Sequence, residues 1–561
     1  MMKNNKYYLC WLLFIASIFQ LSGKVDEFRE RIYLQTDKQS YLAGEPVWMK
    51  LLTTDSEQIP VMFSKVAYVE LLNDSVSHLQ IKVELRNGTG EGFMQLPVDL
   101  PTGYYRLVAY TQFMRNEGSE IYFEKHIGII NTFQANNILR AETENNFSPN
   151  NVSYSETVSL QSDKTVYTTR EYGELIINNL PEAVHTLSVS IAGKDFIPVA
   201  ESNVLSLKKQ PTKLPSYSKK FIPEYEGHIV TGKIVDNQTG NYYEPDDARM
   251  FPYLTFSGEG IRFFAGQKGK SGEVLFFTSN ISGLKEVSTT VVYSEEQYRV
   301  DIVSPFIQRH ETKQMPTLQI DTAYNKQLLE RSVALQVMHY LSEDFQTDQS
   351  ISDPFFKMKP TWSYILDEYT RFTTMGEVFT EITFGARFRR EGGKRQLSIL
   401  INRGNYYDYV FVPLVLLDGI PITDHEIIYH YDPLSVERIN VYSGPYIMGG
   451  HIIDGIIELS TYRRNHSDIT LDKSTQILTY EGTQLHRTFY TPDYSQEKNR
   501  QNRLPDNRHT LLWIPNVQTD GKSSIRLPFD TSDFKGEFQV TVEGLDKDGN
   551  AIFAKSFFKV E

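Results

Sequence analysis

Cysteine is nearly absent from this sequence. The 561 residues contain a single cysteine, Cys10, which lies inside an apolar run over residues 9–19. Lys3 and Lys6 precede that run, and small residues follow it. A charged start, a short apolar core and a small-residue end are typical of a secretory signal peptide, so we predict that residues 1–23 are removed on export. An uncleaved membrane anchor is the alternative interpretation.

Export with removal of Cys10 would exclude several kinds of chemistry. A chain without a thiol has no disulfide, no thiolate nucleophile and no cysteine metal ligand. Long apolar runs are also missing, because no later stretch approaches the roughly 18 consecutive apolar residues that a membrane helix needs. We therefore expect no integral membrane span after signal cleavage, and a stability that comes from ordinary hydrophobic cores.

Positive charge is in deficit. Lys and Arg number 57 against 70 Asp and Glu, so the formal net charge is -13 and the isoelectric point is near 5.5. This balance opposes attraction to phosphate backbones, and we expect no nucleic-acid partner. With 40% hydrophobic and 13% aromatic residues the chain can fold throughout most of its length, and it is too long for a single core.

Helical periodicity is also scarce. Most of the chain consists of short β-branched and aromatic runs separated by turn signals, which predicts strands. In the run over residues 103–111, Tyr105, Leu107 and Ala109 alternate with other residues, and we expect them to face a core. Helical spacing occurs only at residues 328–341 and 362–379, which we interpret as packed connectors. The predicted fold class is mainly β, with several β-sandwich domains and short connecting helices.

One sequence pattern occurs twice, at positions 126 residues apart. The first copy contains Leu34–Lys38, Tyr41 and Glu45, and the second contains Leu160–Lys164, Tyr167 and Glu171. We interpret Asp-Lys as the start of a turn, Tyr as an insertion into the next strand, and Glu as the end of the bend. The repeat predicts two related sandwiches. A catalytic acid pair with Lys38 is the alternative, disfavoured because no His or nucleophile lies nearby in the sequence.

Residues 27–131 resemble the macroglobulin domains of bacterial alpha-2-macroglobulin-like envelope proteins. The motifs that carry this resemblance are Tyr33–Lys38, Gly44–Trp48 and Leu107–Asn116. The segments 156–205 and 511–544 are similar to the same domains, and 226–302 resembles a carboxypeptidase regulatory-like β-sandwich, which implies fold ancestry and no peptidase. Covalent protease trapping of the thioester type needs a cysteine, so its absence after export excludes that mechanism.

Residues 380–465 resemble the plug domain of TonB-dependent outer-membrane receptors, which implies a small α+β module. The matching motifs are Pro413–Pro421, Asp432–Ile439, Gly444–Pro445 and Asp454–Thr461. A receptor barrel of about 22 strands of 9–11 residues would need well over 200 residues. Far fewer follow this module, so we expect that the chain does not build a barrel of its own.

Other functional motifs fail on their spacing. His425 and His430 are five residues apart, so they would not share the helical face that a zinc helix needs. The glycine-rich segment 266–272 lacks the first glycine of a phosphate-binding loop and reads as a hairpin turn. Residues 546–550 lack calcium-loop spacing and also read as a turn. No serine-hydrolase elbow occurs. We predict no catalytic residue, no cofactor and no metal site.

The sequence divides into seven predicted parts. They are a signal peptide (1–23), a macroglobulin-like sandwich (24–132), a second one (150–207, with a possible extension), a carboxypeptidase regulatory-like sandwich (226–305), a helical connector (320–380), the plug-like module (381–465) and a C-terminal macroglobulin-like sandwich (508–561). Loops on rigid β scaffolds commonly carry recognition. The candidate partner contacts are therefore loop residues of the plug-like module, namely Gly419, Asp424, Tyr431, Gly444, Tyr446, Gly450 and Asp454.

These observations predict a non-enzymatic, exported binding or scaffold protein of the gram-negative envelope, in the periplasm or associated with the outer membrane. Its expected partner is an envelope or outer-membrane protein whose identity the sequence does not give. Two alternatives are an accessory subunit of TonB-dependent outer-membrane uptake and a hydrolase with an unrecognised site.

Overall fold

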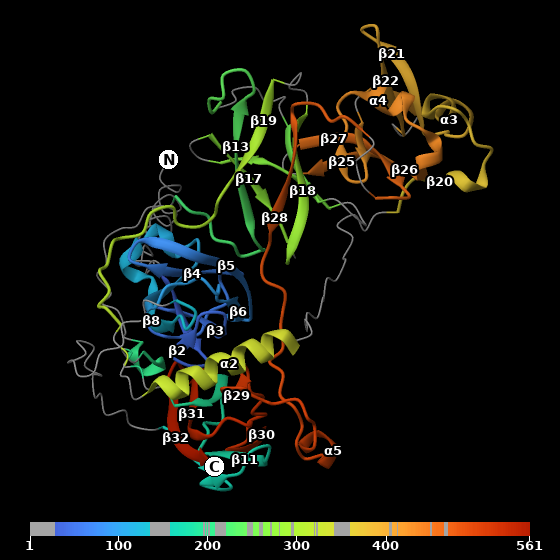
Figure 1. The fold of residues 1–561 in the computed structure, drawn as a ribbon. Coiled ribbons are helices and arrows are strands. Elements are labelled where there is room, and N and C mark those ends of the chain that lie inside the picture. Colours follow the sequence, from blue (N-terminus) through green and yellow to red (C-terminus); the bar gives the residue numbers. More distant parts are fainter. Residues whose placement is uncertain are drawn as a thin grey trace, which may run out of the picture.

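The computed structural model describes most of the chain from residue 28 onward (Figure 1). It describes residues 28–561 except 135–156, 195–196, 198, 200–201, 208–219, 244–250, 257–261, 270–271, 280, 293–296, 319, 321–323, 342–358, 403–406, 412, 449–450 and 465–468. The predicted signal peptide therefore lies outside the described residues. Strands dominate these parts, arranged in several sheets with few helices, which confirms the mainly β fold class.

Sandwich A contains eight strands in the order β1-β3-β6-β5-β4-β7-β8-β2. They are β1 (Glu30–Thr36), β2 (Ser40–Leu42), β3 (Pro46–Asp55), β4 (Val66–Asn73), β5 (Val76–Arg86), β6 (Thr89–Gln95), β7 (Gly103–Tyr110) and β8 (Phe123–Ile130). The alternation on β7 is confirmed, since Tyr105, Leu107 and Ala109 are all buried in one core with Leu34 and Met49.

Sandwich B is built from two segments that are far apart in the sequence. One sheet has the order β10-β32-β31-β12-β29 and the other β30-β11-β9. The early strands are β9 (Ser159–Ser162), β10 (Val166–Tyr167), β11 (Tyr172–Asn178) and β12 (Val184–Gly193); the late strands are β29 (Thr510–Ile514), β30 (Ser524–Asp530), β31 (Gly536–Asp546) and β32 (Ala551–Val560). The predicted division into separate sandwiches at 150–207 and 508–561 is therefore wrong. Four strands alone would leave one face of their core open, and the late strands cover it.

Sandwiches A and B share one strand order. In each, three strands form one side (β1-β3-β6 and β9-β11-β30) and five form the other (β5-β4-β7-β8-β2 and β29-β12-β31-β32-β10). The turn between β4 and β5 in sandwich A spans only two residues. At the same place in sandwich B, between β12 and β29, the chain inserts residues 194–509.

The repeated sequence pattern forms the same turn in both sandwiches. The Asp37 carboxylate accepts hydrogen bonds from the Tyr41 hydroxyl (2.8 Å) and the Trp48 amide (3.1 Å). In the second copy, the Asp163 carboxylate accepts from the Tyr167 hydroxyl (2.6 Å) and from a strand amide (2.7 Å). Each tyrosine lies on a strand that pairs in parallel with the last strand of its sandwich. The predicted structural interpretation of the repeat is confirmed.

Sandwich C consists of the sheets β16-β17-β13-β19 and β15-β14-β18-β28. Its strands are β13 (Ile229–Asp236), β14 (Phe251–Phe256), β15 (Arg262–Ala265), β16 (Gln267–Lys268), β17 (Glu273–Phe277), β18 (Leu284–Val292), β19 (Tyr298–Val303) and β28 (Thr475–Glu481). The pairing of β16 with β17 confirms the hairpin predicted for the glycine-rich segment. The predicted unit, 226–305, omits β28, which returns from beyond the next module to pair with β18.

Module D begins after sandwich C and contains the sheet β20-β26-β27-β24-β25 and a smaller sheet β21-β22-β23. Its elements are β20 (Trp362–Ile365), α3 (Met375–Glu381), β21 (Ala386–Glu391), β22 (Lys394–Asn402), β23 (Tyr407–Phe411), β24 (Leu414–Leu417), β25 (Ile420–Pro421), α4 (His425–His430), β26 (Val436–Met448) and β27 (His451–Thr461). The prediction of one helical stretch over 362–379 is wrong at its start, because β20 pairs with β26 there.

Helix α2 (Asn325–Leu341) lies across sandwich A (Figure 1). Its Arg331 is buried and forms an ion pair with Glu45 (2.7 Å), and its Ser332 hydroxyl is 2.6 Å from the Thr132 hydroxyl. Apolar residues of the helix pack beside Leu42. The prediction of a packed connector is confirmed for this helix.

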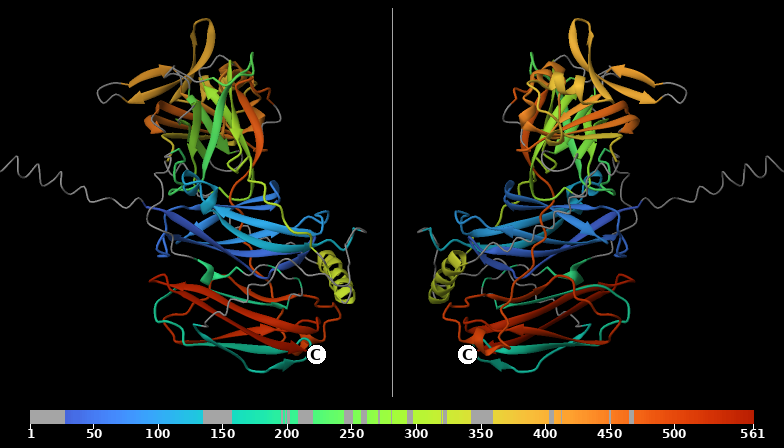
Figure 2. Two further views of the ribbon diagram at one scale, coloured as in Figure 1. Left: turned by 90° about the vertical axis from the view of Figure 1, so that its left-hand side faces the viewer. Right: turned by 90° about the vertical axis from the view of Figure 1, so that its right-hand side faces the viewer.

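The sandwiches form a stack (Figure 2). Sandwich A lies between sandwich B at one end and sandwich C with module D at the other. After β28 the chain passes sandwich A on its way to sandwich B, and Gln484 accepts a hydrogen bond from the Phe93 amide (3.0 Å). In the part of the chain that the structure describes, no helix is both long and apolar enough to cross a membrane.

Candidate functional site

Module D packs directly on sandwich C. Leu414 and Leu416 of β24 share a core with Tyr253 and Phe263 of sandwich C. The alternate residues of the same strand point the other way, into the core of module D itself. A strand that is buried on both faces reads as an uninterrupted apolar run, which explains the sequence Leu414–Leu417.

Three predicted contact residues hold the fold of module D. Gly419 has a φ of +86° in the turn between β24 and β25, a conformation that disfavours other residues. Asp424 caps helix α4, because its side chain accepts a hydrogen bond from the Glu426 amide (3.0 Å). Tyr431 is only 8% exposed and belongs to the module core. Gly419 and Tyr431 are buried, whereas Asp424 is exposed although its carboxylate is engaged in the helix cap.

The other predicted contacts lie on or near the hairpin of β26 and β27. A Cβ on Gly444 would approach the Asp454 carbonyl oxygen to 2.6 Å, so glycine allows the two strands to meet closely. The pairing register shifts there, between Ser443 and Tyr446. The Tyr446 hydroxyl donates to the Ser443 carbonyl (3.0 Å), and its ring packs against the core shared with sandwich C. Gly450 lies outside the described residues.

Beyond this register shift, the hairpin carries two isoleucines opposite each other. Ile447 pairs with Ile452, and they are 78% and 70% exposed. The next pair inward is Tyr446 with Ile453, both of which belong to the core shared with sandwich C. The hairpin therefore has a base fixed against two cores and an apolar end in solvent. The sequence analysis missed both isoleucines, whose only signal is their place on either side of Gly449 and Gly450 in the sequence.

A buried polar cluster joins sandwiches A and C. The Glu224 carboxylate accepts from the Tyr68 hydroxyl (3.0 Å) and is 2.8 Å from Nδ1 of His228. Nε2 of His228 is 2.5 Å from the Tyr480 hydroxyl. Burial lowers the pKa of His228, which favours its neutral form. Both ring nitrogens are already partnered and the cluster is closed to solvent, so it serves to hold the modules together.

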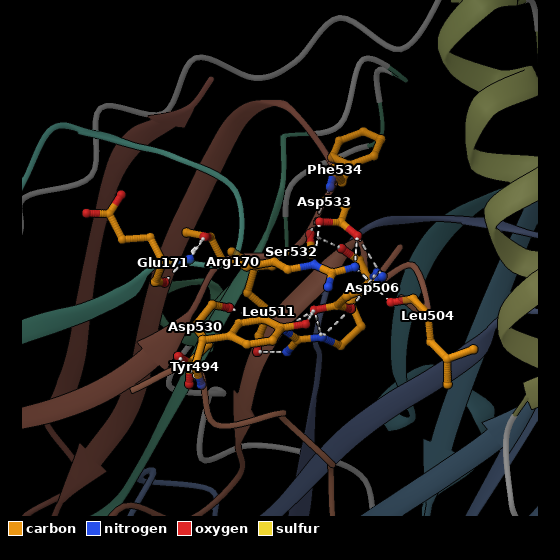
Figure 3. Close-up of polar contacts among 12 residues, drawn as sticks. Arg170, Glu171, Tyr494, Leu504, Asp506, Leu511, Asp530, Ser532, Asp533 and Phe534 are labelled. Carbon is orange, nitrogen blue, oxygen red and sulfur yellow. Dashed lines mark hydrogen bonds and ion pairs between the residues drawn. The ribbon is translucent and has the colours of Figure 1, made fainter. Parts of the chain in front are cut away.

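A second polar cluster fixes the returning chain on sandwich B (Figure 3). Arg170 donates twice to Asp533, at 2.6 and 2.8 Å, and Arg508 donates to Asp506 at 2.7 and 2.8 Å. The Tyr494 hydroxyl donates to the same Asp506 (3.0 Å). Such two-point arginine–carboxylate pairs are directional and strong. Each of these two carboxylates is thus paired with an arginine.

The neighbouring acids respond to burial and pairing in different ways. Burial raises the pKa of Asp530, whose carboxylate accepts from the Tyr494 amide (3.0 Å). Burial would also raise the pKa of Asp533, yet the hydrogen bonds from Arg170 bring it below its usual value. Sequence reasoning missed this cluster because Arg170 and Asp533 are 363 residues apart.

The histidines of helix α4 point to different surroundings. Nδ1 of His425 accepts a hydrogen bond from the Leu397 amide (3.0 Å), and burial lowers the pKa of His425 to about 4. His430 is largely exposed. Among the residues that the structure describes, no three His, Cys, Asp or Glu side chains are gathered so that they could hold a metal ion. At residues 546–550, the Asp546 carboxylate accepts from the amides of Asp548 and Asn550, which confirms the predicted turn.

A cleft of about 840 Å³ lies where sandwiches A and B meet the returning chain. Its lining mixes acids, bases and amides, including Glu91, His185, Asn516 and Lys547. One of these acids is already paired, because Glu91 lies 2.8 Å from Nε2 of His486. The cleft is a polar gap between modules.

Comparison with known proteins gives a limited result. No family model matches the chain, and no curated protein matches it. Solved structures include the Escherichia coli alpha-2-macroglobulin (9% identity, TM-score 0.23, 95% of this chain and 44% of that one) and a Salmonella alpha-2-macroglobulin mutant (10%, 0.23, 95% and 39%). The Escherichia coli adhesin FdeC matches at 10% identity and a TM-score of 0.13, over 52% of this chain and 64% of that one.

The chain spans less than half the length of these macroglobulins. TM-scores this low define neither a family nor an activity for it. The plug-like resemblance of module D has no counterpart among these structures.

Proposed function

We propose that this chain is a non-enzymatic binding and scaffold protein of the gram-negative envelope, which presents module D to a protein partner. The observation that supports the proposal is the hairpin of β26 and β27. Its exposed Ile447 and Ile452 lie next to a base that is packed on sandwich C. An exposed apolar pair on a rigid support is suited to binding, because little conformational entropy is lost when a partner covers it.

The rest of the chain serves as the support in this proposal. Sandwich A is tied to sandwich C through Glu224 and His228, and to sandwich B through a bond from the Thr510 hydroxyl to Asp37 (2.7 Å). Module D is tied to sandwich C by an apolar core. Buried contacts of this kind oppose hinge motion between modules. A stack fixed at each junction would hold the hairpin at a set distance from sandwich B.

The envelope location rests on the amino-terminal segment and on the resemblances of the sequence. The order of charge, apolar run and small residues supports export. The macroglobulin-like motifs and the plug-like motifs both point to envelope proteins. In this proposal the plug-like module serves as a docking unit, and its partner is an envelope or outer-membrane protein.

The experiment is a crosslinked pull-down from fractionated native envelopes. Fully burying an isoleucine is worth about 1.5 to 3 kcal/mol, so Ile447→Ser with Ile452→Ser should weaken capture about thirtyfold or more. The matched control is Ile59→Ser with Leu284→Ser, which removes two exposed apolar side chains elsewhere. The proposal would be contradicted if the hairpin double variant and the control double variant captured the partner equally well. It would also be contradicted if the native protein captured no envelope protein. Capture of a transport protein would favour the uptake alternative within the same binding role.

A further inference from the structure

The three-stranded sheet β21-β22-β23 is basic although the chain as a whole is acidic. Residues 386–411 contain five arginines and one lysine against two acids, while the whole chain has a net charge of -13. The sheet stands out from the body of the molecule at the end opposite sandwich B (Figure 2). Its positive charge is therefore presented away from the acidic bulk of the chain.

Two of these arginines share one aromatic ring. The guanidinium carbon of Arg387 lies 3.6 Å from the centroid of the Tyr409 ring, and that of Arg389 lies 4.5 Å from it. The residue between them, Phe388, points to the other face and packs against Phe379 of helix α3. The helices thus cover one face of the sheet, and the arginine pair lies on the opposite face.

Aromatic side chains continue this surface. The Tyr409 hydroxyl donates to the Phe384 carbonyl (3.0 Å), and the Phe384 side chain is 66% exposed. Trp362 meets the Phe384 ring edge to face, with centroids 5.9 Å apart. A Cβ on Gly385 would lie 2.1 Å from the Trp362 ring, so only glycine lets the indole lie there. The arginine–aromatic surface consists of Trp362, Phe384, Arg387, Arg389 and Tyr409.

The charge of Arg387 has no carboxylate partner among the described residues, and the side chain is exposed. By contrast, Arg395 of the neighbouring strand forms an ion pair with Glu426 (3.1 Å). The Arg389 guanidinium lies beside the same ring, so the charge of Arg387 is held near a like charge, and the two charges repel each other. A bound carboxylate would relieve this repulsion by charge-assisted, two-point hydrogen bonding.

We propose that the arginine–aromatic surface binds an acidic segment of a partner protein. Carboxylates of that segment pair with Arg387 and Arg389, and its apolar side chains cover Phe384 and Trp362. Trp, Tyr and Arg are the residue types that dominate binding energy at protein interfaces. The exposed Phe384 and the partly exposed indole of Trp362 favour a protein segment over phosphate groups alone, which would leave them uncovered. This surface does not include Ile447 or Ile452, although its Trp362 lies on β20, which pairs with β26, and the inference goes beyond the proposed function.

The test measures fluorescence anisotropy of labelled poly-L-glutamate with the purified full-length protein at low and physiological salt. Arg387→Gln with Arg389→Gln should weaken binding at least tenfold, and Tyr409→Leu should weaken it severalfold. The matched control is Arg390→Gln, which removes the same charge from the same strand. Thermal unfolding of each variant checks that the fold is retained.

Three results would overturn this inference. One is the absence of poly-L-glutamate binding by the native protein. Another is an equal loss from Arg390→Gln, which would mean that only net charge matters. The third is binding to phosphatidylglycerol vesicles in place of poly-L-glutamate. If Arg387→Gln with Arg389→Gln abolished that binding, a lipid surface would be the ligand. Ile447→Ser should leave poly-L-glutamate binding unchanged, so the result is independent of the hairpin.

Discussion

The two copies of the repeated turn allow one substitution to be compared in two surroundings. Tyr41 and Tyr167 are both buried, and each hydroxyl donates to the aspartate at the start of its turn. Burial raises the pKa of Tyr41 well above its usual value, so its hydroxyl keeps its proton and remains a donor. The copies differ at the acceptor, because Asp37 is 4% exposed whereas Asp163 is exposed. The perturbation is Tyr→Phe at each position.

The expected loss of unfolding free energy depends on whether water can replace the tyrosine hydroxyl as hydrogen-bond donor to the aspartate. In Tyr41→Phe no water reaches Asp37, and a hydrogen bond to a buried charged group is worth about 1.5 to 3 kcal/mol. In Tyr167→Phe water hydrates Asp163, so the cost should be about 0.5 to 1 kcal/mol. The two variants should therefore differ by about 1 to 2 kcal/mol in their loss of unfolding free energy. If that free energy falls by about 2 kcal/mol per M urea for one sandwich, this corresponds to a difference of roughly 0.5 to 1 M between the shifts of their urea midpoints.

Hydrogen exchange measured by mass spectrometry across a urea series separates the two sandwiches. Peptides from β2 and β3 report on sandwich A, and peptides from β10 and β11 report on sandwich B. Tyr41→Phe should lower the midpoint of sandwich A more than Tyr167→Phe lowers that of sandwich B. Equal shifts, or a larger shift in sandwich B, would refute the reasoning that burial of the acceptor sets the cost.

Two further predictions concern module D and sandwich B. The folded pKa of His425, about 4, lies below its unfolded value of about 6.5, so its neutral form stabilises the fold above pH 6.5. This stability should be lost, by roughly 3 kcal/mol, as the pH falls from 6.5 to 4; His425→Gln should flatten this part of the stability–pH curve, and a curve of unchanged slope would contradict the assignment. Asn178 and Ser524 are opposite each other on β11 and β30, so Asn178→Cys with Ser524→Cys should form a disulfide, seen as faster migration on a non-reducing gel. Two thiols that stay free under mild oxidation would contradict the joining of the two segments.

Local features of the fold could be predicted from the sequence. The repeated turn depends on residues within a few positions of one another, as in Asp37, Tyr41 and Lys38. The alternation on β7 and the turn at residues 546–550 are likewise local. Strand and turn signals of this kind act over fewer than a dozen residues, so they predict elements and their buried faces well.

Long-range pairing could not be predicted. The pattern of β12 shows that its faces are buried, but nothing in it identifies β31, whose Val542 pairs with Val189, as its neighbour. An apolar periodicity indicates that one face of a strand is buried, but it does not identify the element that packs on that face. For the same reason β28 was not assigned to sandwich C, and the strand at Trp362 was read as helix.

The sequence predicted partner contacts in module D but did not single out its exposed isoleucines. Loop residues such as Asp424 and Tyr431 serve capping and core packing, which a single sequence does not distinguish from recognition. The exposed pair Ile447 and Ile452 lies in an apolar strand pattern like that of buried strands, and the sequence does not show that both side chains lie in solvent.

The central claim is that the end of the β26–β27 hairpin contacts an envelope protein. A photo-crosslinking amino acid placed at Ile447 or Ile452 in the native envelope tests it directly. The account predicts a discrete crosslinked species containing an envelope protein from both positions, and none from the same probe at Leu284, which is 71% exposed on sandwich C. No crosslink from the hairpin, or the same species from Leu284, would contradict the claim.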